Sequence, residues 1–206
     1  MNEPKRQSDF SLAALKAGDR DEFARLVDVY SGPIYRLALK ILNDVQDAEE
    51  VLQETFIKAF RYLATFEGRS SLSTWLYRIA VNEALMMVRQ RRPNVISTDE
   101  EKSGDEGELE PLQIVDWHNL PEDELLSSET QTVLDAAVQQ LPETLKVVFV
   151  LRDIQDLSVK ETAEALNLSE TAVKTRLLRA RLRLRDSLST YFKERVREDQ
   201  EKNRVK

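Results

Sequence analysis

The chain has 206 residues, of which 33% are charged and 7% aromatic, and it carries a formal net charge of −7. It contains no cysteine, which excludes disulfides, thiolate catalysis and zinc fingers. No apolar run approaches the roughly 20 residues needed to span a bilayer, and the polar first ten residues lack the apolar core of a signal peptide, so we expect a cytoplasmic protein without membrane insertion.

The acidic charge is concentrated in the middle of the chain. Residues 93–129 contain 12 acidic side chains and one basic side chain, whereas residues 1–92 and 130–206 carry net charges of +1 and +3. The middle stretch is rich in Ser and Gly and lacks apolar periodicity, as is typical of a flexible linker. We therefore predict a domain over 1–92, an acidic linker over 93–128, a second domain over 129–192 and a charged tail over 193–206. The apolar patch LQIVDW within the linker is interpreted as a transiently docking loop, with a partner-binding motif as the alternative.

The first domain is predicted to be all-α. A helix over SLAALKAG ends at Gly18, and Asp19 caps the helix RDEFARLVDVYS. Pro33 is expected near the start of a further helix, GPIYRLALKIL. A long amphipathic helix follows, and a polar loop, EGRSSLS, leads to a last helix that Pro93 stops. The apolar side of the long helix is predicted to be Val51, Leu52, Thr55, Phe56, Ala59, Phe60 and Leu63.

The second domain is predicted to be helical as well. The β-branched stretch VVFVL could form a strand in isolation, but the helical pattern that flanks it favours a buried helix. The next helix begins with a capping box, Ser158 and Glu161, and after a short turn Ser169 caps the final helix. A helix, a short turn and a longer basic helix are typical of a helix-turn-helix.

The final helix is predicted to bind DNA. Between Lys174 and Arg185 it contains six basic residues and no acidic residue. A helical projection predicts a stripe that packs on the domain, formed by Val173, Leu177, Ala180, Leu184 and Leu188. Side chains suited to base edges and phosphates then point outward or lie on a flank, namely Thr171, Lys174, Thr175, Arg176, Leu178 and Arg179. A merely solvated surface is the alternative, which the preceding capped helix and the lack of acids disfavour.

Two segments resemble a known family. The stretch DAEEVLQETFIKAFRYLATFEGRSSLSTWLYRIAVNEALMMVRQRRP resembles region 2 of the extracytoplasmic-function sigma factors, bacterial transcription initiation factors of the sigma-70 superfamily that serve stress responses. The stretch LPETLKVVFVLRDIQDLSVKETAEALNLSETAVKTRLLRARLRLR resembles their region 4. The order of the two segments and the linker between them match the family.

The resemblance implies partners and roles for particular residues. It implies that the chain binds core RNA polymerase, through the β′ clamp helices and the β flap, and binds promoter DNA, and it admits an anti-sigma factor. The polymerase contacts would be Asp47, Glu50, Gln53 and Glu54. At the −10 element, bases would be contacted by Ser70, Ser71 and Asn82, the backbone by Arg78, Arg89 and Arg92, and the melted junction by Trp75, for which a core position is the alternative. The outward residues of the final helix would read the −35 element, and the acidic linker would thread the polymerase cleft.

One departure from the wider superfamily concerns promoter melting. Housekeeping sigma factors have a Trp pair where this chain has Trp75 followed by Leu76. The difference implies weaker melting and a stricter dependence on a good promoter.

Two other functional classes are weighed against this interpretation. A helix-turn-helix repressor or activator would bind duplex DNA without polymerase, but it leaves the Arg/Asn stripe of the first domain unexplained. An enzyme is disfavoured although Asp47, Glu50 and Glu54 share a helical face, because carboxylate-bridged metal sites need Glu-x-x-His pairs and the single histidine, His118, lies in the linker. We therefore expect no catalysis, no metal and no cofactor.

Overall fold

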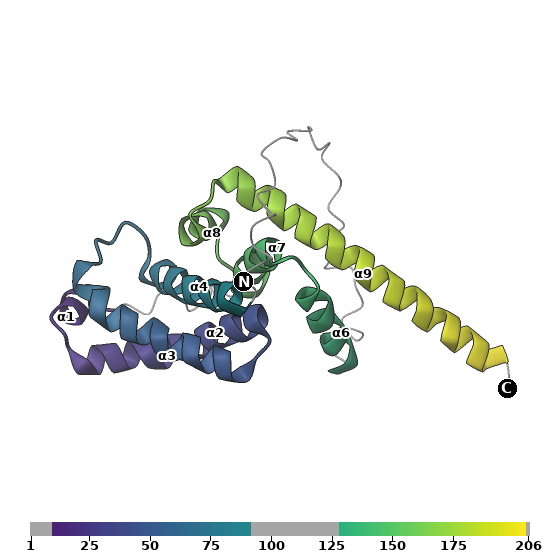
Figure 1. The fold of residues 1–206 in the computed structure, drawn as a ribbon, viewed down its shortest axis with the longest axis horizontal. Coiled ribbons are helices and arrows are strands. Elements are labelled where there is room, and N and C mark those ends of the chain that lie inside the picture. Colours follow the sequence, from purple (N-terminus) through teal and green to yellow (C-terminus); the bar gives the residue numbers. More distant parts are fainter. Residues whose placement is uncertain (1–9, 92–127, 205–206) are drawn as a thin grey trace, which may run out of the picture.

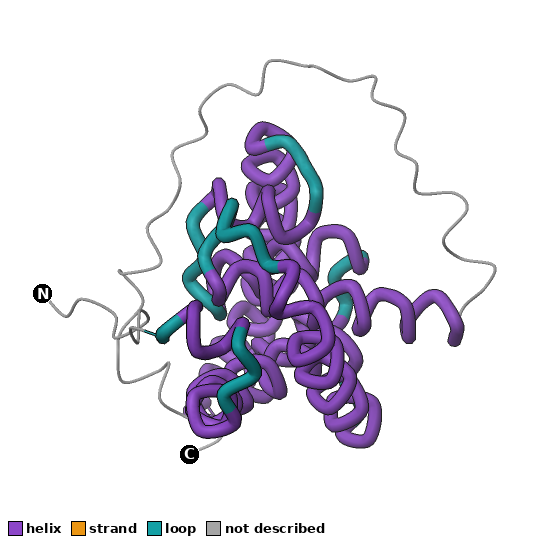
Figure 2. The backbone as a smooth tube through the Cα atoms, turned by 90° about the vertical axis from the view of Figure 1, so that its left-hand side faces the viewer, coloured by secondary structure: helices purple, strands orange, loops and turns teal. Residues whose placement is uncertain are grey.

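The computed structural model describes residues 10–91 and 128–204, and within these ranges every regular element is helical (Figure 1). The all-α prediction is therefore confirmed. Helices joined by short loops account for almost the whole described backbone (Figure 2). No helix among the described residues is long and apolar enough to cross a membrane. The predicted linker up to residue 127, with its LQIVDW patch and His118, and also Arg92, lie outside the described residues.

The elements fall into two groups, which we call the N-terminal bundle and the C-terminal bundle. The N-terminal bundle consists of α1 (Leu12–Lys16), α2 (Arg20–Leu42), α3 (Val45–Tyr62), the 3₁₀ turn η1 (Leu63–Thr65) and α4 (Leu72–Arg91). The C-terminal bundle consists of α6 (Ser128–Gln139), α7 (Glu143–Phe149), the π-helical turn η3 (Val150–Ile154), α8 (Val159–Leu166) and α9 (Glu170–Arg204).

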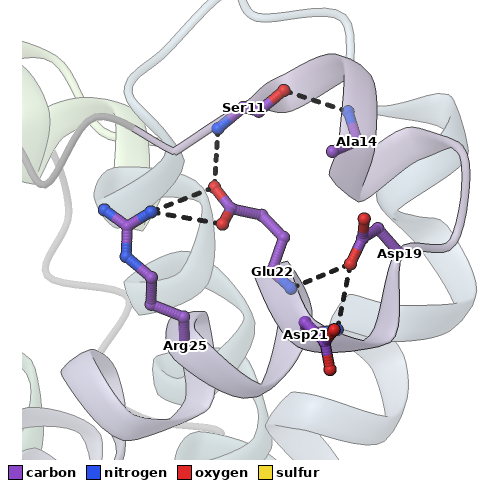
Figure 3. A network of polar contacts seen from close by, with 6 residues as sticks. All are labelled: Ser11, Ala14, Asp19, Asp21, Glu22 and Arg25. Carbon is purple, nitrogen blue, oxygen red and sulfur yellow. Dashed lines mark hydrogen bonds and ion pairs between the residues drawn. The ribbon is translucent and has the colours of Figure 1, made fainter.

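The corner between α1 and α2 shows how local sequence determines helix starts. Asp19 caps α2 as predicted, because its Oδ1 accepts the backbone N–H groups of Asp21 and Glu22, each at 3.0 Å (Figure 3). The carboxylate of Glu22 then accepts the backbone N–H of Ser11 at 2.7 Å and pairs with Arg25 at 3.2 Å. Gly18 follows α1 with a φ of 80°, a conformation that glycine adopts without strain.

Pro33 does not start a helix, contrary to the prediction. It lies inside α2, which runs without interruption over 23 residues. A proline in a helix interior costs about 3 kcal/mol, because it lacks an N–H and its ring crowds the preceding turn. The helix continues because its inner face is buried on both sides of the proline, at Leu26, Tyr30, Ile34, Leu37, Ala38 and Ile41.

Phe60 also departs from its predicted place. Most of the predicted apolar side of α3 is buried, but the Phe60 side chain is 55% exposed. Four residues of an α-helix advance about 400°, so Phe60 lies about 40° further around α3 than Phe56, at the edge of the buried stripe. Its ring packs edge-on against Phe23, with the centroids 5.0 Å apart.

The C-terminal bundle has the predicted helix-turn-helix. The stretch VVFVL is helical, in α7 and η3, and most of it is buried. Glu161 N donates to Ser158 Oγ at 3.1 Å and Ser158 N to Glu161 Oε2 at 2.8 Å, which confirms the capping box. Asn167 ends α8 in the left-handed conformation, and Ser169 Oγ accepts Ala172 N at 3.1 Å at the start of α9.

The two bundles pack against each other. Helix α4 lies beside α8, and α2 contacts α6, α7 and η3 (Figure 1). One continuous core cluster contains buried residues of α2, α3 and α4 together with Val147, Val150, Leu151, Leu157 and Ala165. The two bundles therefore share a core. The domain boundaries stay a prediction from the sequence.

Candidate nucleic-acid interface

Helix α9 is anchored along the predicted stripe. All five stripe residues are buried, namely Val173, Leu177, Ala180, Leu184 and Leu188. Thr171 and Lys174 are exposed on the outer surface of the helix. The other four predicted −35 residues are partly exposed, namely Thr175, Arg176, Leu178 and Arg179. The structure thus brings all six onto the accessible side of one helix.

One of the basic residues of α9 has a structural role that the sequence did not indicate. Arg181 donates through Nε and a terminal nitrogen to the two carboxylate oxygens of Asp153, at 2.9 and 2.8 Å. The hydrogen bond to Asp153 raises the pKa of Arg181, whereas burial opposes that rise. This bidentate pair joins α9 to η3 and fixes the angle of the helix. Arg185 pairs with the neighbouring Asp186 at 3.2 Å.

Helix α4 presents a second row of predicted DNA contacts. Arg78, Asn82 and Arg89 are exposed and follow one another along the same side of the helix. Trp75 is partly buried, and its ring packs on Phe66 with the centroids 5.2 Å apart. The ring is thus packed on one side and partly accessible, and contact of Trp75 with the melted junction stays a prediction.

The two loop serines differ from each other. Ser70 and Ser71 are both partly exposed. Ser71 Oγ accepts the backbone N–H of Thr74 at 3.0 Å and lies 2.7 Å from the Thr74 hydroxyl, so it acts as the N-cap of α4. As the N-cap, the Ser71 hydroxyl points toward the start of α4. Among the described residues, the Ser70 side chain does not cap a helix.

The predicted polymerase contacts of helix α3 differ in their exposure to solvent. Glu50 and Gln53 are exposed, and Glu54 is partly exposed. Asp47 is partly buried and forms an ion pair with Arg91 at the end of α4. Asp47 lies one turn before Glu50 on the same side of α3, and the structure turns its carboxylate toward the end of α4.

Two apolar side chains extend this face of α3, and neither was predicted to lie at the surface. Ile57 is 48% exposed, and Phe60 is exposed as described above. Glu50, Gln53, Ile57 and Phe60 recur at spacings of three or four, which puts them on one side of a helix. An exposed aromatic and aliphatic pair beside polar groups is typical of a protein-binding surface. The helical period was the signal that would have found them.

The comparisons with known proteins concern the same two segments. The family description "Sigma-70 region 2" matches residues 26–93, and "Sigma-70, region 4" matches residues 131–184. The chain is 39% identical over 177 residues to the ECF RNA polymerase sigma factor SigW of Bacillus subtilis (strain 168), covering 86% of this chain and 94% of that protein. It is 34% identical over 185 residues to the RNA polymerase sigma-H factor of Pseudomonas aeruginosa, covering 87% and 93% of the two chains.

A solved structure has the same fold. The sigma factor RpoE from Bartonella quintana, in complex with the anti-sigma factor NepR, superimposes with a TM-score of 0.62 at 23% identity, over 82% of this chain and 98% of that one.

Proposed function

This chain belongs to the extracytoplasmic-function sigma factors of the sigma-70 family, and from that membership we infer how its two bundles act in transcription initiation. It is a transcription initiation factor that binds core RNA polymerase and directs it to promoters. The family comprises initiation factors and not enzymes, and we propose that this chain, acting in the cytoplasm, catalyses no reaction of its own.

The −35 element is read by α9. Lys174 and Thr175 lie one turn into the helix, and Arg179 lies one turn further on the accessible side. Lys and Arg donate to guanine edges and phosphates, and Thr and Leu contact bases through hydroxyl and methyl groups. Burial of the Val173–Leu188 stripe and the Asp153–Arg181 pair hold these groups at a constant angle to the bundle.

The −10 element is read by α4 and the loop before it. Arg78 and Arg89 bind phosphates of the single strand, while Asn82 and Ser70 donate to and accept from a flipped base. The accessible part of Trp75 stacks against the melted junction, supported from behind by Phe66.

Core polymerase docks on the exposed face of α3. Ile57 and Phe60 supply the apolar centre of the contact, and Glu50, Gln53 and Glu54 supply its polar rim. Asp47 acts indirectly in this proposal, because its ion pair with Arg91 ties α3 to the end of α4. An anti-sigma factor is a further expected partner, as in the RpoE–NepR complex.

The observation that carries the proposal is that one chain exposes two separate rows of DNA-type side chains, on α4 and α9, in addition to the mixed apolar and polar face of α3. A gel-shift assay with a promoter fragment tests it. We expect specific binding only when core polymerase is added together with this protein. Tight sequence-specific binding by the protein alone would instead establish the helix-turn-helix repressor or activator.

A further inference from the structure

The row of predicted −10 contacts on α4 contains one residue to which no role has been given. Arg78, Asn82 and Arg89 form the predicted row, and Met86 lies between Asn82 and Arg89 in the same line. Successive members of the completed row are four, four and three residues apart, which keeps them on one side of a helix. At about 100° per residue they span an arc of about 80°. Met86 is 43% exposed, and the other three members are exposed as well.

Met86 differs from the other apolar side chains of α4. The structure describes the whole of this helix, and Met86 is its one exposed large apolar side chain. Its neighbour in sequence, Met87, is partly buried and packs against the core. A single exposed apolar side chain is ordinary on a protein surface. The informative feature of Met86 is therefore its position, inside a row of arginine and asparagine side chains.

The charge of this row favours a nucleic acid as its partner. Helix α4 contains one acidic residue, Glu83, which is buried and has its carboxylate 2.6 Å from the Lys58 ammonium of α3. Among the described residues, Arg78 and Arg89 form no ion pair. The surface around Met86 thus carries positive charge that no acid on the same helix face offsets. A cationic row of this kind is suited to a polyanion.

A methionine can make a contact with nucleic acid that arginine and asparagine do not make. Arginine binds phosphates and asparagine bonds to base edges, but an unpaired base also exposes its faces. The thioether of methionine is flexible and polarisable and packs well on aromatic rings. Proteins that unstack base steps insert methionine and other apolar side chains beside the bases. Met86 is therefore chemically suited to the face of a base.

Helix geometry limits which base Met86 can reach. Asn82 and Met86 are four residues apart, or about 6 Å along the helix axis. Successive nucleotides of one strand are about 3.4 Å apart when the bases are stacked. A strand that follows the row therefore brings Met86 to a base within about two nucleotides of the base at Asn82.

We propose that Met86 is a further contact of the −10 strand, and that its thioether packs on the face of an unpaired base within two nucleotides of the base that Asn82 holds. This inference rests on the proposed function and deepens its −10 site. The contact requires an unstacked base, so it stabilises the melted strand and does not form with duplex DNA. Trp75 offers a second apolar surface, one turn before Arg78, whereas the Leu76 side chain is 0% exposed and takes no part.

Binding of a single strand by the holoenzyme tests this contact. The probe is a fluorescently labelled oligonucleotide with the non-template −10 sequence of a promoter from which the natural chain initiates. We expect Met86→Ala to weaken binding about fivefold, because the contact with the base face is lost. Met86→Leu should restore most of the affinity, because leucine is apolar and similar in size. Val29→Ala, which shortens a similarly exposed apolar side chain on α2, is the matched control and leaves binding unchanged. Circular dichroism confirms that each variant is folded.

Abasic nucleotides then locate the contacted base. Each position of the probe is replaced in turn by an abasic nucleotide, and binding is measured with the natural chain and with Met86→Ala. At the contacted position the two proteins should bind equally, because the base face is already absent. At the other positions Met86→Ala should stay about fivefold weaker. The same scan with Asn82→Ala locates the base at Asn82, and we expect the two positions to lie within two nucleotides of each other.

Three results overturn the inference. Unchanged binding by Met86→Ala shows that the side chain is only solvated. An equal loss at every abasic position shows that Met86 contacts no particular base. Weaker binding of Met86→Ala to core polymerase without DNA assigns the residue to a protein interface. In all three cases the natural chain still initiates, so the proposed function stands. Failure of the natural chain to initiate with core polymerase refutes the proposed function, and the Met86 contact with it.

Discussion

Helices α4 and α9 both carry predicted DNA contacts, but the fold holds them in different ways. With about 100° per residue, the buried side chains of α9 span an arc of about 80°, from Ala180 to Leu188. The buried side chains of α4 span about 180°, because α2 and α3 cover it from one side and α8 from another. When a helix is packed on one side, its own sequence shows which surface stays exposed. When a helix is packed on two sides, only a narrow strip of its surface stays exposed, and the position of that strip depends on both neighbouring elements.

Loss of a buried side chain that anchors α9 should have the largest effect on stability. Leu184 is 1% exposed in the buried stripe, whereas Leu182 is partly exposed on the same helix. We expect Leu184→Ala to lower the free energy of unfolding by about 2–5 kcal/mol, because it leaves a cavity. Leu182→Ala, the matched control, should cost less than about 1 kcal/mol. Urea denaturation measures both, and equal losses would mean that the helix is rotated from the described orientation.

Helix α4 adds a largely buried ion pair with α3 to its apolar packing. Glu83 is buried, and its carboxylate lies 2.6 Å from the Lys58 ammonium of α3. Lys58→Met should destabilise the chain by about 2 kcal/mol, since it leaves a buried carboxylate without its partner. Replacing both residues, with Lys58→Met and Glu83→Gln, should recover part of that loss. Thermal unfolding tests this, and an additive loss in the double variant would contradict it.

The two DNA readers should respond to different promoter elements. Lys174→Ala should reduce initiation about tenfold on a promoter with an intact −35 element. It should also make the slope of log binding constant against log salt concentration shallower by about one. On a promoter with a scrambled −35 element its effect should disappear. Arg78→Ala on α4 should reduce initiation on both promoters. Transcription in vitro over a range of salt concentrations separates the two, and identical responses would show that the assignments to α4 and α9 are wrong.

Removing the Asp153–Arg181 ion pair should have the smallest effect on stability. Because it is partly exposed, Asp153→Asn should cost about 1 kcal/mol of stability. Because the pKa of Arg181 is raised, its guanidinium stays charged at neutral pH and below. The stability that the ion pair contributes would be lost only when the pH rises through that raised pKa. The difference in unfolding free energy between the natural chain and Asp153→Asn should therefore not decline between about pH 6 and 9. A decline with rising pH in that interval would argue against a charged arginine in this pair.

Much of the candidate site could be predicted because its pattern is local. The exposed row on α9 follows from the 3.6-residue period once Val173 and Leu184 are assigned to the core, and the structure confirms that assignment. The ion pair of Asp47 could not be predicted, because its partner Arg91 is 44 residues away in sequence. The same holds for Arg181, which looked like any other basic residue of α9 until Asp153 was found beside it.

The sequence by itself determined where α2, α8 and α9 start: the caps at Asp19, Ser158 and Ser169 bond to groups two or three residues away, so neighbouring residues are sufficient. The tertiary structure decided that α2 continues through Pro33, that Phe60 is exposed and that Gln155 joins the two bundles. A sequence pattern shows that a face is apolar, but the residues that cover that face come from distant parts of the chain. Their packing energy determines which surfaces are buried and which remain free to bind.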